Sequence, residues 1–144
     1  MIAREIVDRI CVLRLDAPPL NALTPPLLEA LGAALRRAEA EPEVAAIVVA
    51  GRADHFSAGA DVALFERIAD AEAAARLSRR FQEAFGAVEA SAKPVIAALA
   101  GRVVGGALEL ALACHARVAA ADARFAMPEV NLGINPGAGG TARL

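Results

Sequence analysis

Two short apolar runs constrain the fold of this chain more than any other feature. Residues 44–50 read VAAIVVA and residues 94–100 read PVIAALA, and a glycine follows each run. Runs of this length without polar alternation are typical of strands that are buried on both faces of a parallel sheet. A helical pattern over about residues 72–90 lies between them, and parallel neighbours need such a crossover. We therefore predict an α/β fold with right-handed crossovers.

The rest of the chain continues this alternation of strands and helices. In chain order we expect two strands within residues 2–15, a helix from Pro25 that ends before Pro42, a short helix from Asp61 to about Ile68, a helix over 107–114, strands over 116–121 and 124–127, and a helix that begins at Thr141. We expect loops over residues 51–60 and 101–106. Because the sequence stops where the last helix begins, we treat residues 1–144 as one domain that is truncated at its C-terminus.

Composition and charge exclude several classes of protein. With 57% hydrophobic residues and a net charge of −2, the chain is far from the composition of a disordered protein. No cluster of Lys and Arg indicates a nucleic-acid interface, and no apolar run approaches the roughly 18 residues of a membrane span. The N-terminus lacks the apolar core of a signal peptide, and the two cysteines lie far apart in the sequence. We therefore expect a cytoplasmic protein without nucleic-acid or membrane partners.

A nearly all-apolar helix with one carboxylate is the first candidate for chemistry. Residues 107–114 read ALELALAC, so a helix there is buried on every face, and Glu109 is its only charged residue. A buried carboxylate is paired, protonated or functional, because an unpaired buried charge is costly. Gly105 and Gly106 allow a ligand to approach the backbone, and the free N–H groups of the first helical turn favour negative charge. The alternative is that Glu109 lies on a partly exposed edge and forms a structural salt bridge.

Two further segments offer functional groups, each with an ordinary structural alternative. Residues 55–61 (HFSAGAD) follow a buried strand, and ligands of α/β proteins gather at the carboxyl ends of strands. Gly59 allows a turn that aims the N–H of Ala60 outward, although an ordinary loop in which Asp61 caps the next helix explains the same residues. Glu129 follows a short apolar strand, and taken alone it is a surface carboxylate.

Other kinds of site are absent from the sequence. The cysteines and histidines lack the spacing of metal ligands, so we expect no metal; we interpret His55 as a loop histidine and Cys11 and Cys114 as core residues. No Gly-x-Ser-x-Gly elbow is present for a serine nucleophile. The glycine stretch over residues 133–140 lacks the lysine of a phosphate-binding loop, which argues against nucleotide hydrolysis.

Four segments, in order, resemble the crotonase superfamily and specifically the enoyl-CoA hydratase/isomerase family. They are Asn21 to Leu23 (NAL), Phe56 to Asp61 (FSAGAD), Gly105 to Glu109 (GGALE), and Pro128 to Leu144, which contains PE and LGINPGAGGTARL. The spacing of the two glutamates, Glu109 and Glu129, also fits the family pattern. The resemblance covers nearly the whole chain and implies a spiral of repeated β-β-α units from which the C-terminal helical part is missing.

The resemblance implies a role for each segment. It implies that the N–H groups of Ala60 and Gly106 form an oxyanion hole for a thioester oxygen, and that Glu109 and Glu129 are the catalytic acid–base pair. The expected contacts with the substrate and its CoA moiety are made by Ala22, Ala58, Gly59, Asp61, Gly105, Pro128 and Gly137. The implied reaction is hydration of trans-2-enoyl-CoA to 3-hydroxyacyl-CoA, as in fatty-acid β-oxidation, with no cofactor beyond the coenzyme A of the substrate.

Three alternatives stay open beside hydration. The chain could catalyse enoyl-CoA isomerisation or another crotonase reaction, form the first domain of a multifunctional β-oxidation enzyme, or bind acyl-CoA without catalysis. The presence of both glutamates favours hydration, because isomerases of the family typically lack the one at the position of Glu109. The resemblance also implies that the complete protein is a homo-oligomer, either a trimer or a hexamer.

Overall fold

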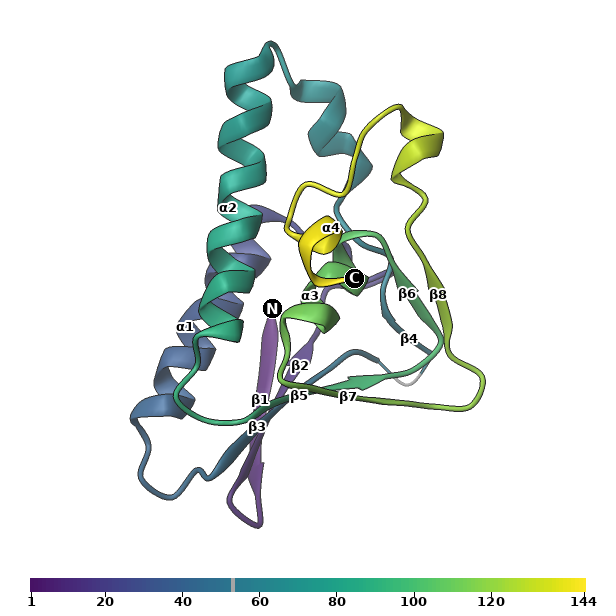
Figure 1. The fold of residues 1–144 in the computed structure, drawn as a ribbon. Helices are drawn as coiled ribbons and strands as arrows, with labels where there is room; N and C mark the ends of the chain where they lie inside the picture. The colour runs from purple at the N-terminus through teal and green to yellow at the C-terminus, as the bar shows by residue number, and fades with distance from the viewer. Residues whose placement is uncertain (53) are drawn as a thin grey trace.

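The structure is a computed structural model that describes residues 1–52 and 54–144 (Figure 1). In chain order its elements are β1 (Ile2–Val7), β2 (Ile10–Leu15), α1 (Pro25–Ala40), β3 (Ala46–Ala50), β4 (His55–Ser57), η1 (Val62–Arg67), α2 (Ala71–Glu89), β5 (Val95–Leu99), β6 (Arg102–Val104), α3 (Gly106–Ala113), β7 (Ala116–Ala119), β8 (Arg124–Ala126), η2 (Glu129–Leu132) and α4 (Gly140–Arg143). The elements η1 and η2 are 3-10 helices.

The described strands form two sheets, and from β3 onward successive strands alternate between them. The larger sheet has the order β1-β2-β3-β5-β7, and the smaller sheet has the order β4-β6-β8. Only β1 runs antiparallel to its neighbour; β2, β3, β5 and β7 are parallel, as are the three strands of the smaller sheet. After the β1–β2 hairpin and α1, each turn of the chain therefore adds one strand to each sheet, and a helix connects one turn to the next. This arrangement confirms the predicted α/β spiral of β-β-α units.

Local sequence signals explain how the first elements begin and end. Asp8 and Arg9 both have positive φ, the geometry of the tight turn whose twist matches an antiparallel hairpin. Helix α1 begins after Thr24, whose side chain accepts a hydrogen bond from the N–H of Leu27 at 3.4 Å, and proline occupies its first position. It ends at Ala40, before Pro42, as predicted.

The two long helices and α3 provide most of the helical contribution to the core. Helices α1 and α2 lie side by side, and α3 lies between them and the smaller sheet (Figure 1). The buried residues of α2 are Phe81, Phe85 and Val88, and the rings of the two phenylalanines meet edge to face with centroids 5.9 Å apart. Helix α3 is almost entirely buried, as its apolar sequence predicts.

The prediction of loops over residues 51–60 and 101–106 was wrong, because each range contains a strand. Strands β4 and β6 have three residues each, which is too short to show a periodic pattern, and they pair with each other in the smaller sheet. His55 is consequently a buried strand residue with 7% exposure, not a loop histidine. The helix that Asp61 caps is also a 3-10 helix rather than an α-helix.

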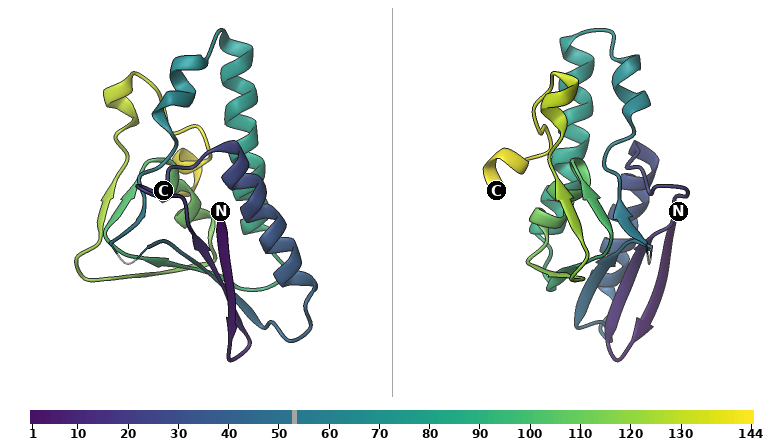
Figure 2. Two further views of the ribbon diagram at one scale, coloured as in Figure 1. Left: turned by 180° about the vertical axis from the view of Figure 1, so that it is seen from behind. Right: turned by 90° about the vertical axis from the view of Figure 1, so that its right-hand side faces the viewer.

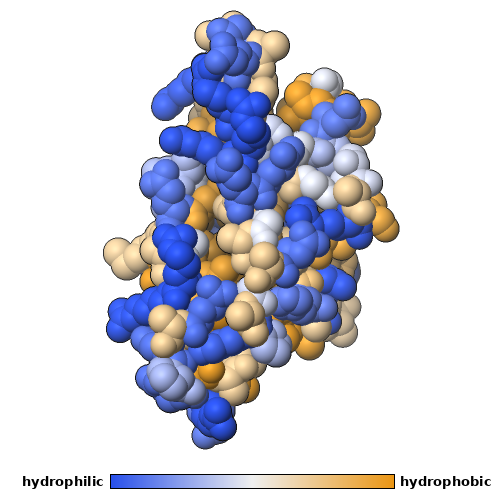
Figure 3. Space-filling model, turned by 60° about the vertical axis from the view of Figure 1, so that its left-hand side comes forward, coloured by the Kyte–Doolittle hydropathy of each residue, from blue (hydrophilic) through white to orange (hydrophobic). Residues whose placement is uncertain are grey.

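The outer faces of the molecule differ in character. The face over α1 and α2 is mostly hydrophilic (Figure 3). The β1–β2 hairpin and strand β8 lie at opposite sides of the molecule (Figure 2, right). Strands β7 and β8 are exposed along their whole length and present Val118 and Phe125 to solvent. In the part of the chain that the structure describes, no helix combines the length and apolar character needed to cross a membrane.

Candidate active site

Three functional groups lie just beyond the carboxyl ends of the three parallel strands of the smaller sheet. Ala60 follows β4, Gly106 follows β6, and Glu129 follows β8. Since these strands are neighbours in the order β4-β6-β8, their carboxyl ends meet at one edge, which is where ligands of parallel sheets bind. Ala60, Gly106 and Glu129 line one cavity of about 190 Å³ together with Glu109. The structure thus brings together all four residues predicted to carry the chemistry.

Two backbone N–H groups converge in this cavity. A Cβ atom placed on Gly106 would lie 3.5 Å from the backbone nitrogen of Ala60, so the two residues are in close contact. Gly106 is the first residue of α3, where N–H groups have no acceptor within the helix. Within residues 1–52 and 54–144, neither the N–H of Ala60 nor that of Gly106 has a hydrogen-bond acceptor. Two adjacent free donors of this kind can bind one ligand oxygen and stabilise negative charge on it.

Glycine is required on the chain just before each of these donors. Gly59 has φ +90°, and a Cβ there would collide with the carbonyl oxygen of Val104. Gly105 has φ +54°, and a Cβ there would lie 2.6 Å from Oε1 of Glu129. A side chain at Gly105 would therefore displace the carboxyl group that the cavity presents.

Glu109 is held by backbone donors rather than by a cation. Its side chain is 3% exposed, and its Oε1 accepts hydrogen bonds from the N–H groups of Ala138 and Gly140, both at 2.8 Å. Among the described residues it forms no ion pair, so the alternative of an exposed edge and a structural salt bridge was wrong. A Cβ on Gly140 would lie 2.8 Å from Cγ of Glu109, which leaves room only for glycine at that position.

The surroundings of Glu109 raise the pKa of its carboxyl group above the ordinary value. Burial raises the pKa of the carboxyl group, and the nearby carboxylate of Glu129 raises it further. The hydrogen bonds from Gly140 and Ala138 and the charge of Arg143 act in the opposite direction, but the pKa remains above its ordinary value. A carboxyl group of this kind is suited to exchange protons nearer to neutral pH.

Glu129 presents an unpaired oxygen to the same cavity. It is the first residue of η2, and its Oε2 is buried without a hydrogen-bond partner in the described part of the chain. An unsatisfied buried carboxyl oxygen is costly, and such groups are found where a ligand or catalysis requires them. Its position at the wall corrects the interpretation of Glu129 as a surface carboxylate, which the residue taken alone suggested.

The remainder of the cavity wall is mostly apolar. Its apolar side chains come chiefly from η1, α2 and the segment before α4; they are Phe65, Ile68, Ala74, Leu77, Phe81, Ile134 and Ala138. The cavity therefore combines backbone donors and carboxyl groups with apolar walls that suit a hydrocarbon chain. Leu77 and Phe81 also have the helical spacing of a core stripe in α2, so the sequence alone does not distinguish a cavity wall from the core there.

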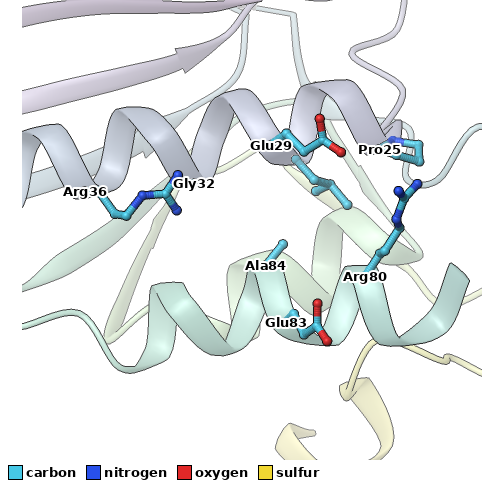
Figure 4. A pocket seen from close by; sticks show the side chains of 8 residues that line it. Pro25, Glu29, Gly32, Arg36, Arg80, Glu83 and Ala84 are labelled. Atoms are coloured by element: carbon cyan, nitrogen blue, oxygen red, sulfur yellow. The ribbon is translucent and has the colours of Figure 1, made fainter. Parts of the chain in front are cut away.

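A larger cavity elsewhere lacks this chemistry. It has a volume of about 330 Å³ and lies between α1 and α2, where Glu29, Arg36, Arg80 and Glu83 surround it (Figure 4). Its charged side chains are of both signs, and the described residues that line it include no pair of adjacent free backbone donors. The smaller cavity is the candidate site because of its converging groups, not because of its size. Among the described residues, no cluster of His, Cys, Asp or Glu could hold a metal ion.

The predicted substrate contacts are placed less uniformly than the four chemical groups. Gly137 lines the cavity, and its carbonyl accepts hydrogen bonds from the side chains of Ser78 and Gln82 at 2.6 and 2.7 Å. Asp61 caps η1 by accepting from the N–H of Ala63 at 3.0 Å. The other predicted contacts are adjacent in sequence to cavity or loop residues but do not line the wall; they are Ala22, Ala58, Gly59, Gly105 and Pro128. Their contacts with a substrate stay predictions.

One positioning contact was not predicted from the sequence. Arg143 donates to the carbonyl of Ala138 at 3.1 Å and pairs with Glu89 of α2 at 2.7 Å. It therefore connects helix α2 with the turn whose N–H groups bind Glu109. The pair joins residues that are 54 positions apart, and no local pattern in the sequence indicates such a contact.

Comparisons with known proteins agree with this geometry. The family profile described as "Enoyl-CoA hydratase/isomerase" matches residues 5–144. A probable enoyl-CoA hydratase of Bacillus subtilis is 44% identical over 135 residues, which cover 94% of this chain and 52% of that protein. A crotonyl-CoA hydratase of Syntrophomonas wolfei is 40% identical over 146 residues, which cover 97% of this chain and 54% of that protein. A peroxisomal bifunctional enzyme of Danio rerio is 40% identical over 97% of this chain but only 19% of its own length.

Solved structures show the same fold. The crystal structure of an enoyl-CoA hydratase from Thermoplasma volcanium superimposes with a TM-score of 0.92 at 34% identity, covering 99% of this chain and 57% of that chain. The structure of DspI from Pseudomonas aeruginosa gives a TM-score of 0.91 at 35% identity, covering 99% and 58%. The chain thus spans about half the length of the single-function relatives that it matches.

Proposed function

Because this chain belongs to the enoyl-CoA hydratase/isomerase family, we propose that it forms the catalytic core of an enzyme that adds water to trans-2-enoyl-CoA. One observation carries the proposal. Two free backbone donors, Ala60 and Gly106, and two carboxyl groups, Glu109 and Glu129, line a single cavity whose other walls are apolar. These are the groups that a conjugate addition of water to a thioester needs.

The two backbone donors would bind the thioester oxygen. When water adds at C3, negative charge builds up on that oxygen as the thioester takes on enolate character. Donors fixed in advance at this position stabilise the transition state more than the ground state, and each is worth about 2.7–4 kcal/mol in comparable sites. The reaction then requires no metal or redox cofactor, and coenzyme A enters only as part of the substrate.

The two carboxyl groups would move the protons. Glu109 takes a proton from the attacking water as the new C3–O bond forms, and Glu129 gives a proton to C2 as the electron pair of the double bond arrives there. The product is 3-hydroxyacyl-CoA, and the two glutamates have exchanged protonation states. The fixed Oε1 of Glu109 supports this assignment, because its backbone donors leave the second oxygen to hold the water.

Loss of the absorbance of crotonyl-CoA tests the proposal directly. We expect the 144-residue chain to hydrate crotonyl-CoA, and we expect Glu109→Gln and Glu129→Gln to lower kcat by at least about 100-fold, as is typical for loss of a general acid or base. Binding of a saturated acyl-CoA should remain close to that of the wild-type chain. Near-normal turnover in either variant would contradict the roles assigned to Glu109 and Glu129.

A shift of the double bond is the second candidate. The unpaired Oε2 of Glu129 favours it, since one carboxyl group could carry a proton between two carbons of the acyl chain without help from Glu109. The two glutamine variants separate the reactions: isomerisation predicts that Glu109→Gln is tolerated while Glu129→Gln is not. The resemblance to a bifunctional enzyme also allows this chain to be one domain of a multifunctional β-oxidation enzyme. Tight acyl-CoA binding without any turnover would instead indicate a binding protein.

The cellular compartment, the partner and the assembly of the whole protein are also proposals. We place it in the cytoplasm, with an acyl-CoA as its small-molecule partner and a trimer or hexamer as its assembly. Exposed apolar residues on β7, β8 and η2 support an assembly, because their burial against another copy would be favourable; they are Val118, Phe125, Val130 and Leu132.

A further inference from the structure

We propose that Asn21 and Ser57 are positioning residues that aim the N–H of Ala60 at the thioester oxygen. The inference rests on the proposed function and concerns the hydrogen bonds that orient the backbone around Ala60. Asn21 and Ser57 are two of the few polar residues in the described chain with no solvent exposure at all. Neither lines the cavity, so neither touches the substrate in this role.

The side chain of Asn21 joins two segments that are distant in the sequence. Its Nδ2 donates to the carbonyl of Phe56 at 3.1 Å, and its Oδ1 accepts from the N–H of Ala17 at 2.9 Å. The residue has φ +51°, a conformation that asparagine tolerates better than most residues with a side chain. Asparagine at this position therefore fulfils both a backbone requirement and a hydrogen-bonding requirement.

Ser57 completes the connection next to the oxyanion loop. Its hydroxyl donates to the carbonyl of Asn21 at 2.6 Å and accepts from the N–H of Gly59 at 3.1 Å. One hydroxyl therefore fixes the Ala58–Gly59 peptide, which leads into the Gly59–Ala60 peptide that carries the N–H of Ala60, relative to the segment that carries Asn21. Both its donor and its acceptor capacities are used, which is the condition under which a buried polar group rigidifies its surroundings.

The backbone on either side of Ala60 is tied to the same segment. The N–H of Leu23 donates to the carbonyl of Gly59 at 2.7 Å, and the N–H of Asp61 donates to the carbonyl of Leu23 at 3.1 Å. Both neighbours of Ala60 are held, and among the described residues the N–H of Ala60 itself has no acceptor. The network thus holds the backbone on both sides of Ala60 and leaves the N–H of Ala60 free beside Gly106.

Catalysis is sensitive to the position of such a donor. A misplacement of about 1 Å in a catalytic site can cost on the order of 100-fold in rate, and removal of an oxyanion donor costs about 100-fold to 1,000-fold. Loss of the Ser57 hydroxyl frees the N–H of Gly59 and lets the Ala58–Gly59 peptide rotate, so that only the bond from Leu23 to the carbonyl of Gly59 still orients the peptide that carries the N–H of Ala60. The donor would remain present but would be aimed less well.

Kinetics with a matched serine control provide the first test. We expect Ser57→Ala to lower kcat for crotonyl-CoA by about 10-fold to 100-fold with KM little changed, and Ser57→Thr, which keeps a hydroxyl, to recover part of the loss. Ser91→Ala is the control. The Ser91 hydroxyl accepts a hydrogen bond from the N–H of Lys93 in the segment that precedes β5, and Ser91 does not line the cavity. Ser91→Ala should leave kcat unchanged. Thermal unfolding of all variants shows whether a loss reflects unfolding.

The carbonyl frequency of a bound ligand reports on the donor itself. Butanoyl-CoA labelled with 13C at the thioester carbonyl binds but cannot be hydrated, and hydrogen bonds lower its stretching frequency. We expect a downshift in the wild-type chain that is smaller in Ser57→Ala and unchanged in Ser91→Ala. If Ser57→Ala keeps both the wild-type kcat and the wild-type shift, the inference is wrong. If the wild-type chain binds butanoyl-CoA without any shift, the proposed function fails, and the inference fails with it.

Amide hydrogen exchange in the wild-type chain keeps the inference testable if Ser57→Ala does not fold. The N–H of Gly59 should exchange slowly, while that of Ala60 should exchange quickly until butanoyl-CoA is added. Exchange at Gly59 that is as fast as exchange at Ala60 in the free chain would show that Ser57 does not hold the loop, and this result would overturn the inference.

Discussion

Glu109 shows how a carboxyl group can be buried in this fold without an ion pair to any described residue. Two backbone N–H groups bind one of its oxygens, and burial together with Glu129 holds the pKa above its ordinary value. Because the unfolded chain has the ordinary pKa, ionisation of Glu109 costs the folded state more than the unfolded state. The stability that the protonated group contributes is present at low pH and is lost as the pH rises through the raised pKa.

A pH series of unfolding curves checks this sign. Glu109→Gln removes the ionisation but keeps a side-chain oxygen for the N–H groups of Ala138 and Gly140. Relative to this variant, the wild-type chain should lose stability as the pH rises from about 4 to about 8. The measurement is the unfolding temperature of both proteins across that range. A stability difference that does not change with pH would contradict a raised pKa.

Two glycines provide a matched pair of alanine substitutions. A Cβ at Gly140 would lie 2.8 Å from Cγ of Glu109, so Gly140→Ala should destabilise the chain by about 1–3 kcal/mol and reduce turnover. A Cβ at Gly86 meets no atom within 4 Å, and Gly86 lies inside α2, so Gly86→Ala should stabilise by about 0.5–1 kcal/mol without affecting turnover. Denaturant unfolding and crotonyl-CoA hydration measure both effects. Equal effects of the two substitutions would mean that space at Gly140 is not limiting.

At the scale of elements, α4 and α2 act on the site through Arg143. This residue fastens the turn at Ala138 to Glu89, and its charge also lowers the pKa of Glu109. Arg143→Gln should therefore raise that pKa further and move the acidic limb of the kcat/KM profile to higher pH, because the proposed base must be ionised. Arg124→Gln is the control, since Arg124 is exposed and hydrogen-bonds only to nearby carbonyls among the described residues. If the acidic limb lies at the same pH in Arg143→Gln and Arg124→Gln, then Arg143 does not influence the pKa of Glu109.

The elements also show what the sequence could and could not predict. Strands β3 and β5 and helices α1, α2 and α3 follow from apolar runs, caps and helical spacing, and they lie within a few residues of the predicted bounds. Strands β4 and β6 could not be predicted, because a strand of three residues has no measurable period and exists only through its pairing partners.

The candidate site was predictable in part for a similar reason. Glu109 is conspicuous as the one charge in an apolar helix, and the glycines mark the chain near both backbone donors. The apolar wall formed by Leu77 and Phe81 has the same spacing as a core stripe, so only the fold reveals it. The network of Asn21 and Ser57 depends on contacts between distant segments, and no pattern of neighbouring residues encodes it.

At the scale of the whole molecule, the exposed strand β7 predicts self-association. It forms an edge of the larger sheet, all its residues are exposed, and Val118 shows 65% of its surface to solvent. Val118→Lys places a charge on this edge, which native proteins use to block pairing between edges. Sedimentation velocity should show weaker association for this variant at equal concentration, with an unchanged unfolding temperature. Undiminished association would mean that β7 is not part of the contact.

The placement of one chemical group after each strand of the smaller sheet has a consequence for how such a scaffold can diversify. The strand ends are set apart by the spacing of a sheet, about 4.8 Å per strand, and the short loops that contain Gly59 and Gly105 then bring Ala60 and Gly106 together. A change after β8 replaces an acid or base, while the donors after β4 and β6 keep their places. On the proposed function, we therefore expect this architecture to separate the binding of a substrate oxygen from the choice of reaction along the carbon chain, so that new chemistry can arise by changing one strand end at a time.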